Sequence, residues 1–215
     1  MTMTFDPARF NALLSNARPG LGQNVSWQKA TACPCRSPTS GAARQGCPTC
    51  HGKGVFWGSS IAAWTGLAGQ KVAREWAAFS EWQSGDVVIT IPSASPLWNI
   101  GETDKVAFTD SSQPFSSVLM GGVDVLPFEA SSISGVVWLD PITQLPVTGG
   151  VPTQGASGQL TWAAGAPPTG TQYTISGRRT PLYYCFKEMA QDRAHSAGLP
   201  LPRRVVLRMF DLFGR

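Results

Sequence analysis

Near the N-terminus, apolar residues recur at the spacing of an α-helix. Phe10, Leu13, Leu14 and Ala17 recur at this spacing, which places them on one face of a helix of about three turns. Asp6 can accept hydrogen bonds from the first free N–H groups, and Pro7 fits the first helical position because no donor is needed there. Pro19 ends the pattern, since proline cannot continue the hydrogen-bond ladder. We therefore predict one short amphipathic helix.

Most of the remaining apolar residues lie in short runs that are typical of strands. Val, Ile, Thr and aromatic residues dominate these runs, and Gly, Pro, Asp or Ser residues separate them. The runs with this pattern are 25–30, 55–57, 86–91, 104–110, 116–120, 135–139, 159–162, 172–177, 183–186 and 205–210. Residues 61–82 can be interpreted as a helix or as a strand, because their alanines favour a helix while Gly66 and Gly69 interrupt it. Short strands separated by turn residues are typical of small barrels and sandwiches.

The predicted fold is mainly β, with a minor helical part (α+β). We expect small β-barrel or sandwich units, together with the N-terminal helix and a cysteine-rich segment. Residues 128–134 form a junction between two sets of strands, and 141–157, rich in Pro, Gly and Thr, are expected to form a long exposed loop. The sequence order therefore predicts three consecutive parts: 1–58 with the helix and the cysteine segment, 59–130 with a barrel-like domain, and 131–215 with a second β-rich domain and a basic C-terminal tail.

Charge is scarce in this chain and unevenly distributed. Charged residues make up only 14% of the sequence, against about 25% in an average soluble domain. Because charge is depleted at the centres of protein interfaces, this favours a surface that meets protein as well as water. The net charge of +4 names no partner by itself. The C-terminal fifth of the chain is its basic part. The candidates there for a surface that faces DNA or an acidic neighbouring protein are Arg178, Arg179, Arg203, Arg204 and Arg208. The alternative is an ordinary solvated face.

The sequence shows no targeting or membrane-spanning segment. No basic and apolar leader of the secretory type follows Met1, and no apolar run approaches the roughly 20 residues that span a bilayer. We therefore expect a protein that is made in the cytoplasm and has no membrane partner. Thiols stay reduced in that compartment, so clustered cysteines are interpreted as metal ligands before disulfides.

Four of the five cysteines lie close together: Cys33, Cys35, Cys47 and Cys50. Structural zinc takes four ligands in a tetrahedron, and the turn of a C-x-x-C pair lets two thiolates reach one ion. The first pair, C-x-C, is tighter but can still reach the same ion. Glycines after Cys50 let the backbone curl under the metal and aim N–H groups at sulfur. Residues 36–46 contain no large apolar side chain, so this loop cannot fold by burial alone. These features predict one structural Zn²⁺ ion bound by all four cysteines.

Other interpretations of the cysteine segment use the same residues. His51 can replace one cysteine as a ligand, and two disulfides can form where the protein meets an oxidising exterior. The C-x-x-C-H string that ends at His51 also matches haem attachment, which requires export. A thioredoxin-type redox pair would need a βαβ pattern that is missing here. The string C-x-x-C-x-G-x-G resembles half of the zinc-binding repeat of DnaJ-type chaperones, but one copy is present and no J-domain signature accompanies it.

The sequence contains no set of residues with a recognisable catalytic arrangement. The two histidines are His51, inside the cysteine segment, and His195, in a polar stretch. Cys185 lies between aromatic residues in a predicted strand, where a buried and inert thiol is expected. Nucleotide-binding, nucleophile-elbow and metalloprotease motifs are missing from the sequence. We therefore predict that the protein is not an enzyme.

Several parts of the chain resemble proteins from the neck of tailed bacteriophages. The stretch 191–215, with its Gly-Leu-Pro-Leu-Pro-Arg-Arg string, resembles the end of such proteins, as does 173–184 before it. The segments 85–92 and 104–106 resemble the small β-barrel of the head-completion or stopper class. The similarity covers residues 85–215 and is one of pattern, without a catalytic string. The zinc knuckle is not a general feature of that class.

The resemblance implies a mechanical role in the virion. Copies of the chain would form a closed homo-oligomeric ring at the head–tail junction, joining the capsid portal and its adaptor proteins to the tail and retaining the packaged DNA. Contact with DNA would be independent of sequence, through the charge of the phosphates. A tail or baseplate component, and a zinc-ribbon nucleic-acid-binding protein, are the alternative functions.

Overall fold

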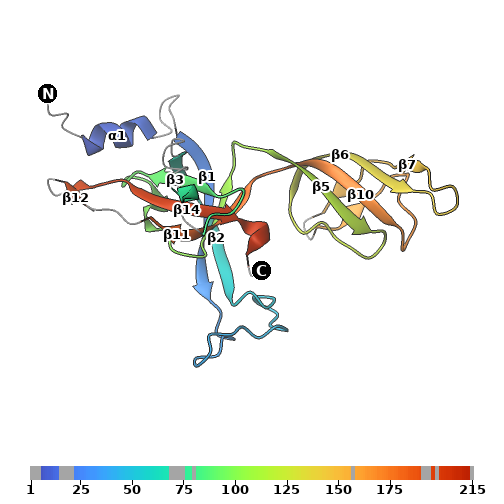
Figure 1. Ribbon diagram of the computed structural model, residues 1–215, viewed down its shortest axis with the longest axis horizontal. Helices are drawn as coiled ribbons and strands as arrows, with labels where there is room; N and C mark the ends of the chain where they lie inside the picture. The colour runs from blue at the N-terminus through green and yellow to red at the C-terminus, as the bar shows by residue number, and fades with distance from the viewer. Residues whose placement is uncertain are drawn as a thin grey trace. The chain divides into compact units, whose positions relative to one another are not determined.

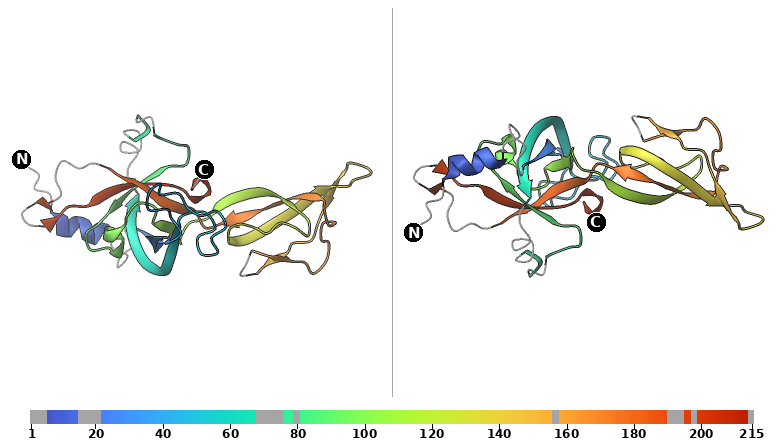
Figure 2. Two further views of the ribbon diagram at one scale, coloured as in Figure 1. Left: turned by 90° about the horizontal axis from the view of Figure 1, so that it is seen from below. Right: turned by 90° about the horizontal axis from the view of Figure 1, so that it is seen from above.

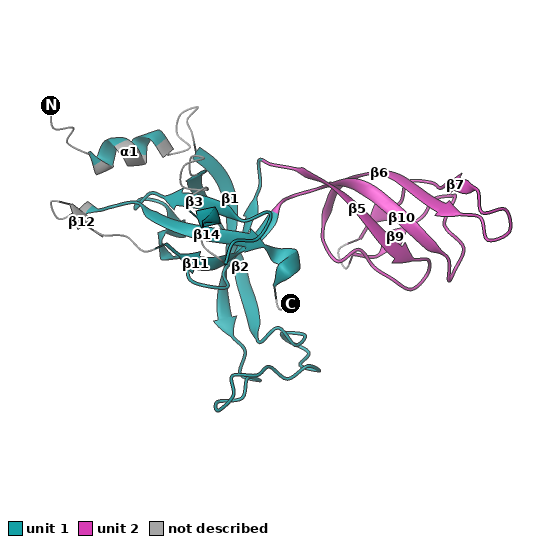
Figure 3. Cartoon of the chain, in the orientation of Figure 1, with its two compact units in different colours: residues 1–110, 182–215 teal, residues 111–181 magenta. Residues whose placement is uncertain are grey.

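The computed structural model describes residues 6–14, 22–67, 76–78, 81–155, 158–189, 195–196 and 199–213. Within these residues the chain is mainly β, as the sequence predicts. Two compact units divide it: unit 1 contains residues 1–110 and 182–215, and unit 2 contains residues 111–181 (Figure 3). A search of the described residues finds no helix with the length and hydropathy needed to cross a membrane.

Six antiparallel strands of unit 1 close into a barrel (Figure 1). In the order in which they pair, they are β1 (Gly22–Ala32), β2 (Val55–Leu67), β3 (Val87–Ile91), β14 (Arg203–Met209), β11 (Leu182–Glu188) and β4 (Lys105–Phe108). β2 is strongly curved (Figure 2), and its last two residues pair with β3 after most of its length has paired with β1. Each of these strands has a paired neighbour on both sides over at least part of its length.

The other elements of unit 1 are short. They are α1 (Pro7–Leu14), η1 (Pro96–Asn99), β12 (His195–Ser196), β13 (Leu199–Pro200) and η2 (Phe210–Leu212). At the start of α1, the Ala8 N–H donates a hydrogen bond of 2.9 Å to Asp6 Oδ1. Ala17, which the sequence pattern assigns to the same helix, lies outside the described residues. Of the ambiguous segment 61–82, residues 61–67 belong to strand β2, whereas 68–75 and 79–80 lie outside the described residues.

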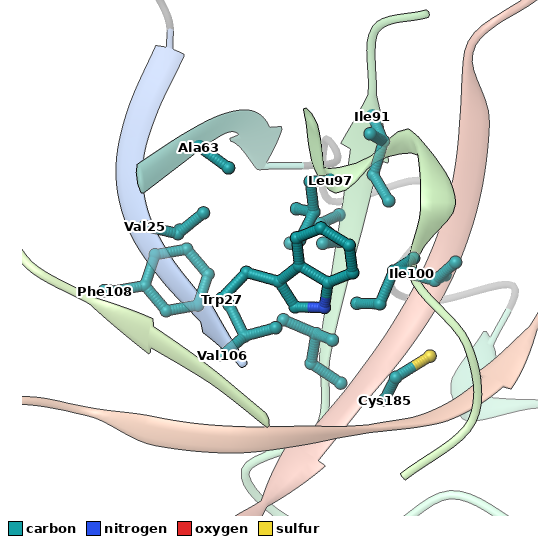
Figure 4. Close-up of a cluster of buried hydrophobic side chains, with 12 residues drawn as sticks. Val25, Trp27, Ala63, Ile91, Leu97, Ile100, Val106, Phe108 and Cys185 are labelled. Carbon is teal, nitrogen blue, oxygen red and sulfur yellow. The ribbon is translucent and has the colours of Figure 1, made fainter. Parts of the chain in front are cut away.

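Side chains from alternate positions of the barrel strands fill its interior (Figure 4). Val25 and Trp27 of β1, Val106 of β4, and Val205 and Leu207 of β14 belong to this core. The spacing of two follows from strand geometry, because successive residues point to opposite faces. Burial of one such side chain contributes about 1.5–3 kcal/mol. The barrel core is therefore sufficient to position the loops that leave its ends.

Unit 2 is an insertion between β4 and β11 with a core of its own. Its sheet contains, in order of pairing, β5 (Gln113–Met120), β10 (Gln172–Arg179), β6 (Ala130–Leu139) and β7 (Pro146–Thr148). A separate hairpin consists of β8 (Thr153–Gln154) and β9 (Leu160–Thr161). The buried residues at the centre of the unit are Leu119, Leu126, Val136, Tyr173 and Ile175.

These two units differ from the three consecutive parts 1–58, 59–130 and 131–215 expected from the order of the sequence. The barrel takes strands from both ends of the chain, since β4 pairs with β11 and β3 pairs with β14. Unit 2 begins and ends inside parts that the sequence had assigned to two different domains. The physical reason is that an inserted unit does not change the sequence pattern of each single strand. It only separates, along the sequence, strands that pair in the barrel.

Candidate metal centre

The four clustered cysteines lie on the loop that joins the first two barrel strands. β1 and β2 pair antiparallel up to Ala32 and Val55, and residues 33–54 form the connection between these partners. This connection projects beyond the barrel strands (Figure 1). Directly after β1, the Cys33 N–H donates to the Gly54 carbonyl over 2.8 Å, which extends the pairing by one further bond. The hairpin therefore brings the two ends of the cysteine segment together.

The four thiols converge on one point. The Sγ atoms of Cys33 and Cys47 are 3.8 Å apart, and those of Cys35 and Cys50 are 3.4 Å apart. All four sulfur atoms lie within 4.8 Å of one another, and none of the four cysteines is in a disulfide. A tetrahedral zinc site with Zn–S bonds of about 2.3 Å requires sulfur–sulfur separations of about 3.8 Å. The spacing of the thiols therefore fits a tetrathiolate site for a divalent metal.

Backbone turns hold the second pair in place. The His51 N–H donates to the Cys47 carbonyl over 2.9 Å, and the Lys53 N–H donates to the Cys50 carbonyl over 2.9 Å. Gly52 and Gly54 have φ values of +81° and +72°, in the left-handed region where glycine has no steric penalty. The two glycines reverse the chain after Cys50, which allows both thiols of the C-x-x-C pair to face the cluster.

The thiols of this cluster have unequal affinities for protons. Backbone N–H groups of Cys50 and Thr49 lower the pKa of Cys47 to about 6. At Cys35, the backbone N–H of Arg44 favours the thiolate, but burial and the three neighbouring thiols together raise the pKa to about 12. Four thiolates at this spacing repel one another without a cation. A bound divalent ion supplies that charge, and its binding would displace protons from the sulfur atoms.

The loop has little apolar packing of its own apart from the cysteines. Its buried cluster consists of Cys33, Cys47 and Cys50, with Cys35 and Phe56 packed against it. Residues 36–46 contribute no large apolar side chain to this cluster. The cysteines therefore take the place that apolar residues occupy in an ordinary loop core, and a metal ion would cross-link them.

The His51 imidazole and the Cys185 thiol, both considered in the sequence analysis, lie apart from the cluster. His51 is exposed and does not belong to the group of converging ligand atoms. Cys185 is buried inside the barrel, where burial and the nearby carboxylate of Asp104 raise its pKa to about 12. A protonated buried thiol is a poor nucleophile, as the sequence predicts for this residue. The candidate ligand set is therefore the four cysteines.

The five candidate basic residues differ in burial and in their partners. Arg208 is buried and makes a bidentate ion pair with Asp86, from Nε to Oδ1 and from Nη2 to Oδ2, both over 2.9 Å. Its guanidinium also lies 3.6 Å from the centre of the Phe186 ring. The expectation that Arg208 faces DNA or a neighbouring subunit is therefore corrected. Its alternating position in β14 places it on the outside of the barrel, but other residues of unit 1 cover it.

The remaining four arginines divide between the units. In unit 1, Arg203 forms a bidentate pair with Glu188 at 2.8 and 2.7 Å, and Arg204 is exposed. In unit 2, Arg178 donates to the hydroxyl and carbonyl of Ser112, and the Arg179 guanidinium lies 4.3 Å from the centre of the Phe128 ring. Most of these cations therefore have protein partners.

An aromatic cluster beside the metal loop was not predicted from the sequence. The ring of Trp57 in β2 lies 5.2 Å from that of Phe210 and 5.6 Å from that of Phe213. The ammonium groups of Lys53 and Lys105 lie over both Trp57 and Phe210, at 4.9–5.7 Å. Lys53 belongs to the metal loop, so the cluster attaches this loop to the C-terminal segment. The Phe-Asp-Leu-Phe string at 210–213 was the available signal.

The comparisons with known proteins leave the family open, since no protein-family model matches the chain and no curated protein has a similar sequence.

Proposed function

We propose that Cys33, Cys35, Cys47 and Cys50 bind one structural Zn²⁺ ion. The convergence of all four Sγ atoms at the spacing of a tetrahedron carries this proposal. Soft thiolate donors in a tetrahedron select zinc or iron over calcium and magnesium. Four protein ligands leave no position for water or substrate, so the ion would cross-link the loop and would not activate a reactant.

Metal analysis of the purified chain tests the zinc site. We expect one zinc per chain by elemental analysis. We also expect the cobalt-substituted protein to show the intense ligand-to-metal charge-transfer absorption of four thiolates. A chain that contains no zinc and shows no such absorption, with all four thiols reactive, would refute the site.

We further propose that the protein is a non-enzymatic structural component of a larger assembly. Of the twelve large apolar side chains exposed in the described part of the chain, eight lie in unit 2. Val118 of β5 is one of these eight, at 63% exposed. A concentration of exposed apolar side chains in one part of a protein favours contact with another protein. The low content of charged residues supports the same role.

The assembly that the sequence pattern favours is the neck of a tailed bacteriophage. In this proposal, copies of the chain form a ring at the head–tail junction of the virion, join the portal and adaptor proteins to the tail, and retain the packaged DNA. The exposed Arg204 is the basic residue of β14 best placed to meet phosphate or an acidic neighbour. The barrel and the inserted unit would then serve as rigid parts of a ring.

Imaging of whole virions, with protein composition by mass spectrometry, tests the assembly role. We expect a ring of this chain between the portal and the tail. A position elsewhere in the tail or baseplate would support that alternative, and absence from virions would refute the structural role.

A zinc-ribbon nucleic-acid-binding protein is the second candidate function. The metal loop carries Arg36, Arg44 and Lys53 and no acidic residue, which is the observation in its favour. Such a protein would shift a DNA fragment at low salt and release it steeply as the salt concentration rises. A shift that is lost in a triple variant of these three residues would support this function, and no shift at low salt would exclude it.

A further inference from the structure

The sheet of unit 2 has an open edge along β5. In the described residues, β5 is the outermost strand and pairs only with β10. The Met120 N–H points away from β10, because it donates to Asp124 Oδ2 over 2.8 Å. Since N–H groups alternate along a strand, those of Ser116 and Val118 lie on the same open edge. Pro114 has no N–H, so the edge available for pairing is centred on Ser116 and Val118.

A second open edge lies on the other side of the same sheet, at the start of β6. β7 pairs only with residues 137–139, so within the described residues 130–135 pair on one side, with β10. A groove of about 870 Å³ runs along this edge. The apolar residues that line it include Val125, Leu126, Phe128, Ile133 and Pro152, and Glu129 is the one charged residue of the lining.

The Gln154 side chain makes hydrogen bonds to the backbone in this groove, as a neighbouring strand would. Its Oε1 accepts a hydrogen bond of 2.7 Å from the Ala130 N–H, and its Nε2 donates one of 2.6 Å to the Phe128 carbonyl. These are the two bonds that the N–H and C=O groups of one residue in an added parallel strand would make. The start of β6 therefore has the hydrogen-bonding geometry of a sheet edge, and the amide of Gln154 occupies its first position.

Neither edge strand carries a charged side chain, and the one proline of β5, Pro114, lies near its start. Charged side chains, lysine above all, normally protect natural sheet edges against strand addition. Val118 of β5 is 63% exposed. It lies in a row with Thr174 and Val137 on the sheet face opposite the core. A strand added along β5 would continue this row and cover Val118.

We propose that β5 of one copy of the chain adds to the β6 edge of a second copy, within the groove along residues 130–135. The two edges belong to one sheet and are different from each other, so the contact is head-to-tail and leaves a free edge at each end. Repetition of such a contact produces a closed ring or an open filament. The inference rests on the proposed assembly role, in which copies of the chain bind one another, and it names the surfaces that they use.

Sedimentation velocity of the full chain and of three lysine variants tests this pairing. Val118→Lys blocks the β5 edge, and Ser132→Lys places a charge in the groove at the β6 edge. Ile142→Lys is the matched control, because it removes a more exposed apolar side chain from the turn between β6 and β7. We expect the wild-type and Ile142→Lys chains to form higher oligomers. Each edge variant alone should stay monomeric, with association weakened on the order of tenfold or more.

A one-to-one mixture of the two edge variants provides the decisive result. Each variant retains the edge that the other lacks, so the mixture should form dimers and nothing larger. A wild-type chain that is monomeric at a concentration on the order of 1 mM, a mixture without dimers, or equal disruption by Ile142→Lys would overturn the pairing. Ser116→Lys replaces Val118→Lys if the latter lowers the unfolding temperature. Virion imaging decides the assembly role separately, so a monomeric chain found in virions would refute only these surfaces.

Discussion

Single substitutions distinguish the contributions of the four thiols and of the His51 imidazole to zinc binding. Cys35→Ser or Cys50→Ser removes one of four converging ligands, and we expect zinc content to fall from one ion per chain to well below one. His51→Ala is the matched control, because this exposed side chain lies outside the ligand group and its loss should leave zinc content unchanged. Elemental analysis after extensive dialysis measures both. Loss of zinc from His51→Ala, with retention in Cys35→Ser, would assign the fourth ligand to the histidine.

The buried pair of Arg208 and Asp86 is expected to dominate the charge contribution to barrel stability. Arg208→Met leaves a buried carboxylate without its cation, which costs about 3–5 kcal/mol. Arg203→Met on the same strand is the control, because its partner Glu188 is half exposed, and we expect a loss of about 1 kcal/mol or less. Denaturant titration of both variants measures the free energies of unfolding. Equal losses would contradict the importance of burial.

The same pair predicts how stability depends on pH. Burial disfavours the ionised form of Asp86, but hydrogen bonds from Arg208, Trp76 and the backbone of Gln83 outweigh it and lower the pKa of this carboxyl. A carboxyl whose pKa is lower in the folded protein than in the unfolded chain stabilises the fold at pH values above its ordinary pKa of 3.8. That contribution is lost as the pH falls through the pKa of the folded state. Unfolding free energies measured from pH 6 down to pH 3 should therefore fall, and fall less in the double variant Arg208→Met/Asp86→Leu. Identical slopes in the two proteins would refute this assignment.

At the scale of elements, the metal loop and the barrel are expected to respond differently to loss of metal. The barrel has its own apolar core, whereas residues 33–54 depend on the buried cysteines. Chelation should therefore accelerate amide hydrogen exchange and tryptic cleavage at Arg36 and Arg44, while exchange in β3 and β14 stays slow. Mass spectrometry of both reactions resolves the segments. Unchanged protection of the loop after complete removal of zinc would contradict the structural role.

The sequence was informative where the signal is local. Metal-ligand spacing depends on neighbouring residues and turns, so Cys33, Cys35, Cys47 and Cys50 were identified from it and the structure brings them together. The segment 141–157 was expected to be one loop, but it contains β7 and β8, of three and two residues. Strands this short have too few residues for a period of two to appear. Arg208 was misassigned because alternation indicates its face of the strand but not what covers that face.

At the scale of the whole molecule, the insertion of unit 2 could not be predicted from the sequence pattern. The pairing of β1 with β4 joins residues 25–28 to 105–108, and β3 with β14 joins 87–91 to 203–207. These partners are selected by shape and burial in three dimensions, since several runs of apolar residues have equivalent patterns. The composition of unit 2, by contrast, is directly visible in the sequence, since residues 111–181 contain few charged residues.

The barrel is expected to fold without unit 2. β4 and β11 are adjacent and antiparallel, with Ala107 opposite Leu182, so a short Asn-Gly turn can replace residues 111–181. We expect the shortened chain to remain folded and to keep one zinc, because the barrel core and the metal loop both lie in unit 1. Circular dichroism and metal analysis test this. An unfolded product would show that the two units are not independent.

X-ray absorption at the zinc edge of the purified full-length protein tests the central claim most directly. The account predicts a first shell of four sulfur atoms at about 2.3 Å from one zinc per chain. A shell that contains nitrogen or oxygen, or a protein that is folded without zinc and has its cysteines paired in disulfides, would contradict it.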